Sequence, residues 1–99
     1  MNIKQLEAFV RIVKNKSFSQ TAKELFLTQP TVSAYISNLE EELGVRLFLR
    51  TTKEVNITEA GEKISLYAKE IIQLSNQIRE VTSGRQEGAM EKEIVISTS

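Results

Sequence analysis

The stretch from Thr28 to Gly44 constrains the fold most, because it carries helix signals at both ends. Thr28 offers a capping hydroxyl, and Pro30 falls in the first turn, where a missing backbone N–H costs little. Gly44 supplies the stop. Apolar residues recur between these signals at spacings of four, three and four residues: Val32, Ile36, Leu39 and Leu43. At 3.6 residues per turn this spacing predicts a helix with one buried apolar stripe.

The side of this helix away from the stripe is short and uncharged. It comprises, with its flanks, Pro30, Thr31, Ser33, Ala34, Ser37 and Asn38. Short hydroxyl and amide side chains let another surface come close, and they reach base edges or phosphates in the major groove of DNA. A Ser/Thr-rich surface helix with no such role is the alternative. The helix alone favours neither interpretation, so the flanking sequence has to decide.

Two shorter helices are predicted before Thr28. Residues 3–15 carry apolar side chains at helical spacing, namely Leu6, Phe9, Val10 and Val13. Ser17 or Ser19 can cap a second helix that runs to about Leu25, and Gln20 is placed to complete a capping box from Ser17. Two helices joined by about three residues, the second with a polar outer face, are the helix-turn-helix arrangement.

An extended pattern replaces the helical one after Gly44. Val45 to Arg50 predicts a strand, Thr51 to Glu54 a polar connection, and Val55 to Ile57 a returning strand. Alternation in the first strand puts Leu47 and Leu49 on one side, with Phe48 and Arg50 on the other. Two short strands after a helix-turn-helix indicate a wing.

The tip of this wing carries two cations, Arg50 and Lys53. Cations at such a tip can meet phosphates or enter the minor groove of DNA. The alternative is that they are ordinary solvated turn charges.

A long final helix is predicted from its cap at Thr58 to about Thr82. Apolar residues at alternating spacings of three and four form a heptad stripe: Ile57, Ala60, Ile64, Tyr67, Ile71, Leu74, Ile78 and Val81. A helix of about 24 residues is roughly 36 Å long and outreaches so small a domain. We therefore expect Ile64 and the later stripe residues to pair with a second chain, the alternative being that the helix packs back on its own domain.

The C-terminal residues no longer follow the heptad pattern. Ser83 to Gly88 reads as the start of a hinge, which we place over residues 84–92. Residues 93–99 are rich in Ile and Val, like a first strand without a partner. The chain is therefore expected to be part of a longer protein.

Composition excludes several classes of protein. The chain has 99 residues, 40% of them hydrophobic, which suits one small domain with a modest core. It has no Cys, His or Asp, which removes disulfides, thiol nucleophiles, imidazole bases and the usual zinc sites. We expect no cofactor, no metal and no enzymatic activity. No apolar run suits a membrane span or a signal peptide, so a cytoplasmic protein is expected.

Charge is balanced overall but not locally. Lys plus Arg equals Asp plus Glu at 13 each, yet residues 1–39 carry five basic against two acidic side chains. The excess directs an anionic partner toward the N-terminal half.

The chain resembles the LysR-type transcriptional regulators of bacteria from residue 1 to about residue 90. The resemblance rests on segments that match in order and spacing: Leu6–Phe9, Ser17–Ser19, Thr28–Ser33, Leu39–Gly44 and Thr58–Gly61. It implies a mostly α fold, a winged helix-turn-helix of three helices and a two-stranded wing over residues 1–58, followed by a dimerising linker helix over 59–83. Residues 93–99 would begin a small-molecule effector domain, which is otherwise missing, and the intact protein would be a dimer or a tetramer.

The resemblance also implies which residues bind double-stranded DNA. They are Ser19, Thr28, Gln29, Pro30, Thr31, Ser33, Ala34, Ser37, Asn38, Arg50, Thr51 and Lys53. The dimer seam would be Ile64, Tyr67, Ile71, Leu74, Ile78 and Val81. Many members of the family have basic residues at the positions of Ala34 and Ser37, which could read guanine. Their absence favours A·T-rich half-sites in an inverted-repeat promoter site.

Two rival functions differ in class from a sequence-specific regulator. One is a coiled-coil interaction module with an incidental helix-turn-helix, which DNA titration would distinguish. The other is an enzyme, which the residue content disfavours because no pair of Glu residues falls in an evident pocket.

Overall fold

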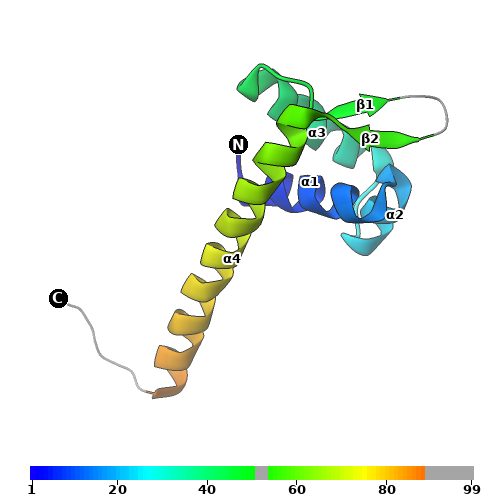
Figure 1. Ribbon diagram of the computed structural model, residues 1–99. Helices are drawn as coiled ribbons and strands as arrows, with labels where there is room; N and C mark the ends of the chain where they lie inside the picture. The colour runs from blue at the N-terminus through cyan, green and yellow to red at the C-terminus, as the bar shows by residue number, and fades with distance from the viewer. Residues whose placement is uncertain (51–53, 89–99) are drawn as a thin grey trace.

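The computed structural model describes residues 1–50 and 54–88 (Figure 1). The described elements are α1 (Ile3–Asn15), α2 (Phe18–Glu24), α3 (Gln29–Leu43), β1 (Phe48–Arg50), β2 (Val55–Ile57) and α4 (Glu59–Gly88). The first three helices and the strand pair form a head, from which α4 leaves as a long arm (Figure 1). The predicted winged helix-turn-helix with a long final helix is confirmed.

The helices begin at side-chain caps. Ser17 accepts a hydrogen bond from the Gln20 N–H at 3.0 Å, and Thr28 accepts one from the Thr31 N–H at 3.3 Å, so the predicted caps of α2 and α3 are confirmed. The capping box predicted from Ser17 does not form, because the Gln20 side chain donates to Glu24 instead. Gly44 ends α3 in the left-handed region, with φ +72°. The cap of α1 was not predicted: Asn2 and Gln5 form a reciprocal capping box, with side-chain-to-backbone bonds of 2.8 and 3.3 Å.

The turn between α2 and α3 is made without glycine. Phe26 takes the left-handed conformation, with φ +59°. Its N–H donates to the Lys23 carbonyl at 3.2 Å, and the Leu27 N–H donates to the Ala22 carbonyl at 2.8 Å. These two bonds form the Schellman pattern that usually ends on glycine. The Phe26 side chain is 95% exposed, so its conformation is not compensated by burial within the chain.

The core lies where α1, α3, the wing and the start of α4 meet. Its buried apolar residues are Leu6, Ala8, Phe9, Ile12, Ala22, Val32, Ile36, Leu39, Leu47, Phe48 and Ala68. The Phe48 ring meets those of Phe9 and Phe18 edge to face, with centroids 5.5 and 5.9 Å apart. Leu43, predicted to be buried with the stripe of α3, is 36% exposed because it is the last residue of that helix.

The wing is a two-stranded antiparallel ribbon in which Phe48 lies opposite Ile57. The predicted return strand is confirmed, but the first strand begins at Phe48 rather than at Val45. Leu47 and Leu49 therefore do not share a side: Leu47 is buried beside Phe48, and Leu49 is 57% exposed. Residues 51–53, with the predicted contacts of Thr51 and Lys53, lie outside the described residues.

The arm α4 is longer than predicted. It runs for 30 residues to Gly88, so the expected end near Thr82 and a hinge at residues 84–88 are wrong. A helix that is already nucleated extends at little cost per residue, and a glycine within it costs only about 1 kcal/mol. Residues 89–99, with the rest of the expected hinge and the expected strand, lie outside the described part. No described helix is long and apolar enough to cross a bilayer.

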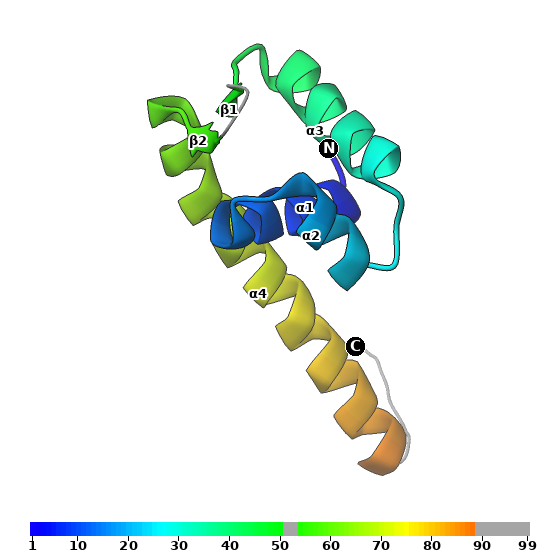
Figure 2. The ribbon, with the colours of Figure 1, turned by 90° about the vertical axis from the view of Figure 1, so that its right-hand side faces the viewer.

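The first half of α4 packs on the head through small residues. Gly61, Ser65 and Ala68 are buried there, and Ile64 and Ile72 pack against the core beside them. Figure 2 shows this half of the arm crossing α1 while the rest extends beyond the head. Packing against its own domain, the alternative raised for this helix, therefore holds for its first turns only.

Candidate nucleic-acid interface

The outward face of α3 is set by complete burial of its opposite side. Val32, Ile36 and Leu39 are 0% exposed, which fixes the rotation of the helix about its axis. The residues away from them that are exposed are Thr28, Gln29, Pro30, Ala34, Ser37 and Asn38, and those half-buried are Thr31 and Ser33. The residues chosen on this helix thus form one accessible surface, and their contact with DNA stays a prediction.

Hydroxyl groups lie together at the N-terminal end of this face. The Thr28 and Thr31 hydroxyls lie 2.8 Å apart, in a hydrogen bond that fixes both side chains at the start of α3. Ser19, the predicted contact on α2, is exposed and its hydroxyl lies 3.4 Å from that of Ser17. Rotatable hydroxyls both donate and accept, so this edge can bond to a phosphate oxygen or to a base edge.

The wing projects from the head next to α3. Figure 2 shows α3 along one edge of the head and the β1–β2 ribbon along another, with α1 and α2 below them. Arg50 ends β1 and pairs in the ladder with Val55. The exposed face of α3 and the ribbon thus lie on neighbouring edges of the head. The Arg50 side chain, with its predicted contacts, lies outside the described part of the chain.

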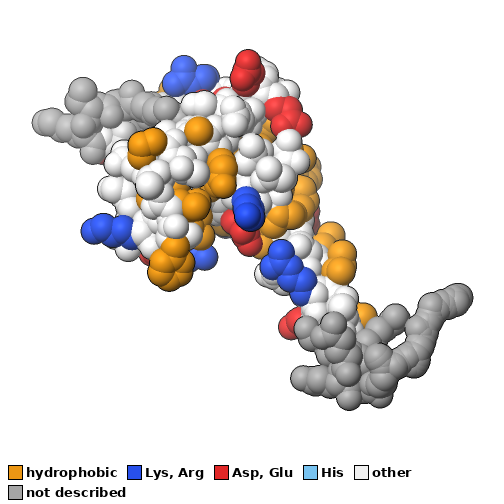
Figure 3. All heavy atoms as spheres, turned by 180° about the vertical axis from the view of Figure 1, so that it is seen from behind, with side chains coloured by type: hydrophobic (Ala, Val, Ile, Leu, Met, Phe, Trp, Pro, Cys, Tyr) orange, Lys and Arg blue, Asp and Glu red, His pale blue; other side chains and the backbone are white. Residues whose placement is uncertain are grey.

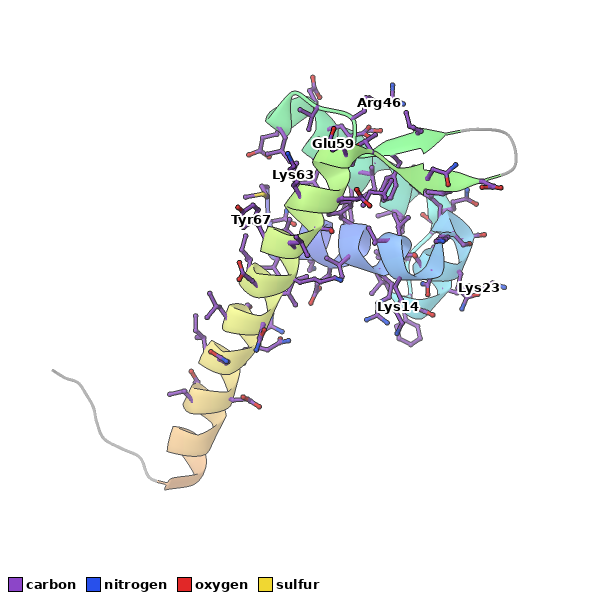
Figure 4. The ribbon with its side chains drawn as sticks, in the orientation of Figure 1. Lys14, Lys23, Arg46, Glu59, Lys63 and Tyr67 are labelled. Atoms are coloured by element: carbon purple, nitrogen blue, oxygen red, sulfur yellow. The ribbon has the colours of Figure 1, made fainter. Side chains whose placement is uncertain are left out.

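Some charged side chains in the head are paired with one another. Arg11 Nη1 lies 3.2 Å from Glu24 Oε1, which also accepts a bond from the Asn15 amide at 3.0 Å. Hydrogen bonds from Asn15 and Gln20, and to a smaller extent from Arg11, hold the pKa of the Glu24 carboxyl below its usual range. Lys14 and Lys23 point away from the head on α1 and α2 (Figure 4). The local basic excess is therefore carried by exposed lysines rather than by Arg11.

The predicted seam residues from Tyr67 to Val81 form an exposed apolar stripe, which begins beside the buried Ala68 and continues along the arm. Tyr67 is 67% exposed and Ile78 is 68% exposed, and Ile71, Leu74 and Val81 are exposed with them. In Figure 3 hydrophobic side chains run along the arm, and in Figure 4 Tyr67 points away from the head. Ile64 differs, because it packs against the core of its own chain. Contiguous exposed apolar side chains of this kind are typical of an interface.

Sequence reasoning missed the role of Glu40. The Glu40 carboxylate accepts a hydrogen bond from the Leu47 N–H at 2.8 Å. Periodicity carries no signal for this contact, since the partner is a backbone group seven residues further along.

These features define the class of winged helix-turn-helix proteins. Residues 3–62 match the family model described as "Bacterial regulatory helix-turn-helix protein, lysR family". The transcriptional regulator YwqM of Bacillus subtilis is 39% identical over 100 residues, which cover 94% of this chain and 34% of YwqM. The chain belongs to the LysR family of bacterial regulators, which confirms the resemblance.

Solved structures agree. The crystal structure of a BenM_DBD/catB site 1 DNA complex matches with a TM-score of 0.84 at 33% identity, covering 91% of this chain and all of that one. Full-length OxyR C199D from Pseudomonas aeruginosa matches with a TM-score of 0.79 at 32% identity, covering 83% of this chain and 27% of that one. The chain thus spans about a third of YwqM and about a quarter of the OxyR chain. These matches are to regulators rather than to enzymes, as predicted.

Proposed function

We propose that this chain binds double-stranded DNA as a homodimer, with α3 in the major groove and the wing on the adjacent backbone or minor groove. The observation that carries the proposal is the short, uncharged, accessible face of α3 opposite its fully buried stripe. The fold is shared with a protein solved in complex with DNA, at a TM-score of 0.84.

The chemistry of the face favours A·T-rich half-sites. The side chains around its centre, Ser33, Ala34, Ser37 and Asn38, offer hydroxyls, one amide and one methyl group, but no guanidinium. Bidentate guanine reading by Arg or Lys is thus not available from these positions, whereas an amide can bond to adenine and a methyl can touch the thymine methyl. An inverted repeat of such half-sites would match the two-fold symmetry of a dimer.

The exposed stripe of α4 supports the dimer. Fully burying one large apolar side chain contributes about 1.5–3 kcal/mol. Five such residues, from Tyr67 to Val81, are exposed in the single chain. A dimer would bury these residues from both chains, and each is already partly buried, so their combined burial can offset an association cost of roughly 4–15 kcal/mol. Pairing of two α4 helices would hold two heads at a fixed separation.

Effector binding belongs, in this proposal, to sequence beyond these 99 residues. The matched region is 34% of YwqM and 27% of the OxyR chain, so most of each protein lies outside the region shared with this chain. Control of transcription by a small molecule would act on the DNA-binding part through α4.

Selection from random-sequence duplexes, followed by titration of the selected duplex, tests the proposal. Ala34→Glu puts a carboxylate in the middle of the reading face at an exposed position, where folding tolerates it. Repulsion from phosphates and loss of close approach should weaken binding by at least about tenfold, or roughly 1.4 kcal/mol.

Asn76→Glu is the matched control, since Asn76 is exposed on α4 away from the head. It should bind like the wild type. Equal affinity of the Ala34→Glu variant, or failure of the selection to enrich any duplex, would contradict the proposed reading face.

A further inference from the structure

The peptide of Leu47 lies between α3 and α4 and is bonded on both sides. On one side, Glu40 Oε2 on α3 accepts the Leu47 N–H at 2.8 Å. The Glu40 side chain is only 12% exposed, and Arg46 Nε lies 3.7 Å from the same oxygen. A carboxylate that accepts a backbone N–H in a partly buried place forms a stronger bond than a neutral acceptor does.

On the other side, the start of α4 binds the same segment. The Leu47 carbonyl accepts the Thr58 N–H at 3.0 Å, and the Thr58 hydroxyl donates to the Arg46 carbonyl at 2.6 Å. That hydroxyl also accepts the Gly61 N–H at 2.9 Å, which caps α4. A Cβ at Gly61 would lie 2.4 Å from the Leu47 oxygen, so α4 rests directly on this carbonyl.

We propose that Glu40 is a positioning residue that fixes the direction of α4 relative to α3 through this junction of Glu40, Leu47, Thr58 and Gly61. The inference rests on the proposed function, because its consequence for DNA is the spacing at which two heads of a dimer read their half-sites. Glu40 lies on the same helix as the reading residues but takes no part in reading.

The direction of α4 matters because a small rotation at the junction causes a large displacement further along the helix. Leu74 lies 13 positions beyond Gly61, which is roughly 20 Å along a helix. A change of about 10° at the junction would displace Leu74 by about 3 Å, close to one base-pair step of 3.4 Å. With a loose junction, the two heads of a dimer would fit half-sites at several spacings. With a fixed junction, they would fit half-sites at a single spacing.

The first test needs no DNA. The chain has no cysteine, so spin labels can be placed on Asn38→Cys in α3 and Gln73→Cys in α4, both exposed, with excess unlabelled chain to suppress distances between subunits. Double electron–electron resonance should give one narrow distance in the wild-type background. Glu40→Ala should broaden it, and Glu40→Gln should largely restore it, because an amide oxygen accepts the same N–H.

Matched variants guard against a trivial result. Glu41→Ala removes an exposed carboxylate from the next position of α3 and should leave the distance narrow. If Glu40→Ala does not fold, Thr58→Val removes the hydroxyl from the other side of the junction and should broaden the distance, whereas Thr58→Ser should not. A distance that stays narrow in Glu40→Ala, or in Thr58→Val where Glu40→Ala does not fold, overturns the proposal.

The second test measures spacing. Duplexes with the selected half-sites one base pair closer or further apart are titrated beside a duplex that holds one half-site. The wild type should prefer one spacing, and Glu40→Ala should reduce that preference roughly tenfold while single half-site affinity changes less than about twofold.

Equal losses of affinity on both kinds of duplex would overturn the positioning role, because they would place Glu40 in the reading itself. A wild type that binds no duplex would reject the proposed function, while the spin-label distance would still decide whether Glu40 positions α4.

Discussion

Gly61 tests the packing of α4 on the head, because helix propensity and packing predict opposite signs for Gly61→Ala. In an ordinary helix this change stabilises by about 1 kcal/mol. Here the new methyl would lie 2.4 Å from the Leu47 oxygen and 2.8 Å from Ile57 Cγ1. Ordinary van der Waals contact begins at 3.4 Å, so α4 would have to move by about 1 Å.

The carbonyl cannot yield easily. It accepts a hydrogen bond from the Thr58 N–H at 3.0 Å, and the Leu47 side chain is fully buried in the core. Overpacking of this kind costs roughly 1–3 kcal/mol, and each strained hydrogen bond adds up to about 1 kcal/mol. The strained bond and the propensity gain are of similar size and opposite sign, so we expect a net destabilisation of about 1–3 kcal/mol.

Denaturant unfolding at one fixed chain concentration measures this change, since the stability of a dimer depends on concentration. For a domain of this size a loss of 1 kcal/mol lowers the Tm by roughly 4–8 °C. Asn76→Ala, at an exposed position of the same helix, should instead stabilise by about 0.5 kcal/mol. A Gly61→Ala protein as stable as the wild type would refute the close contact between α4 and Leu47.

Three further predictions concern separate features. Leu74→Asp puts a carboxylate into the seam, so sedimentation equilibrium should show a monomer, whereas Gln73→Asp should stay dimeric. Phe26→Gly removes a left-handed aromatic residue and should raise the stability by about 0.5–1 kcal/mol in denaturant unfolding, with Phe26→Val having the opposite effect. The lowered pKa of Glu24 means that its stabilising contribution is present above its ordinary value of 4.5 and is lost as the pH falls through the lower folded-state pKa. Acid titration of unfolding should therefore be steeper for the wild type than for Glu24→Gln, and equal slopes would count against the Asn15–Glu24 bond.

Much of the fold could be predicted because its signals are local. Hydroxyl caps at Ser17 and Thr28 and the stop at Gly44 each act within one helical turn, so sequence alone locates them. The buried stripe of α3 follows from a period that any amphipathic helix obeys. The outward face was predictable for the same reason. Burial of Val32, Ile36 and Leu39 fixes the rotation of the helix about its axis, and this determines which residues are exposed.

The errors fall where tertiary contacts override a local pattern. Alternation predicted that Leu47 and Leu49 share a side, but the Leu47 backbone is bonded to Glu40 and Thr58 rather than to the ladder. The left-handed Phe26 was not predictable either, since turn statistics favour glycine or asparagine there. The spacing of apolar residues predicts neither the bonds of the Leu47 backbone nor the conformation of Phe26.

The arm α4 shows why a heptad pattern predicts one face of a helix and misses another. Its large apolar residues, such as Tyr67 and Ile78, form the stripe that the pattern detects, and they remain exposed. The face that holds the head is made by Gly61, Ser65 and Ala68, which carry almost no hydrophobic signal. Small residues are needed there because the helix axis has to approach the Leu47 carbonyl, and a large side chain would hold it away. The two faces lie side by side around the helix, so α4 can be fixed to its own head while its stripe stays open to a second chain.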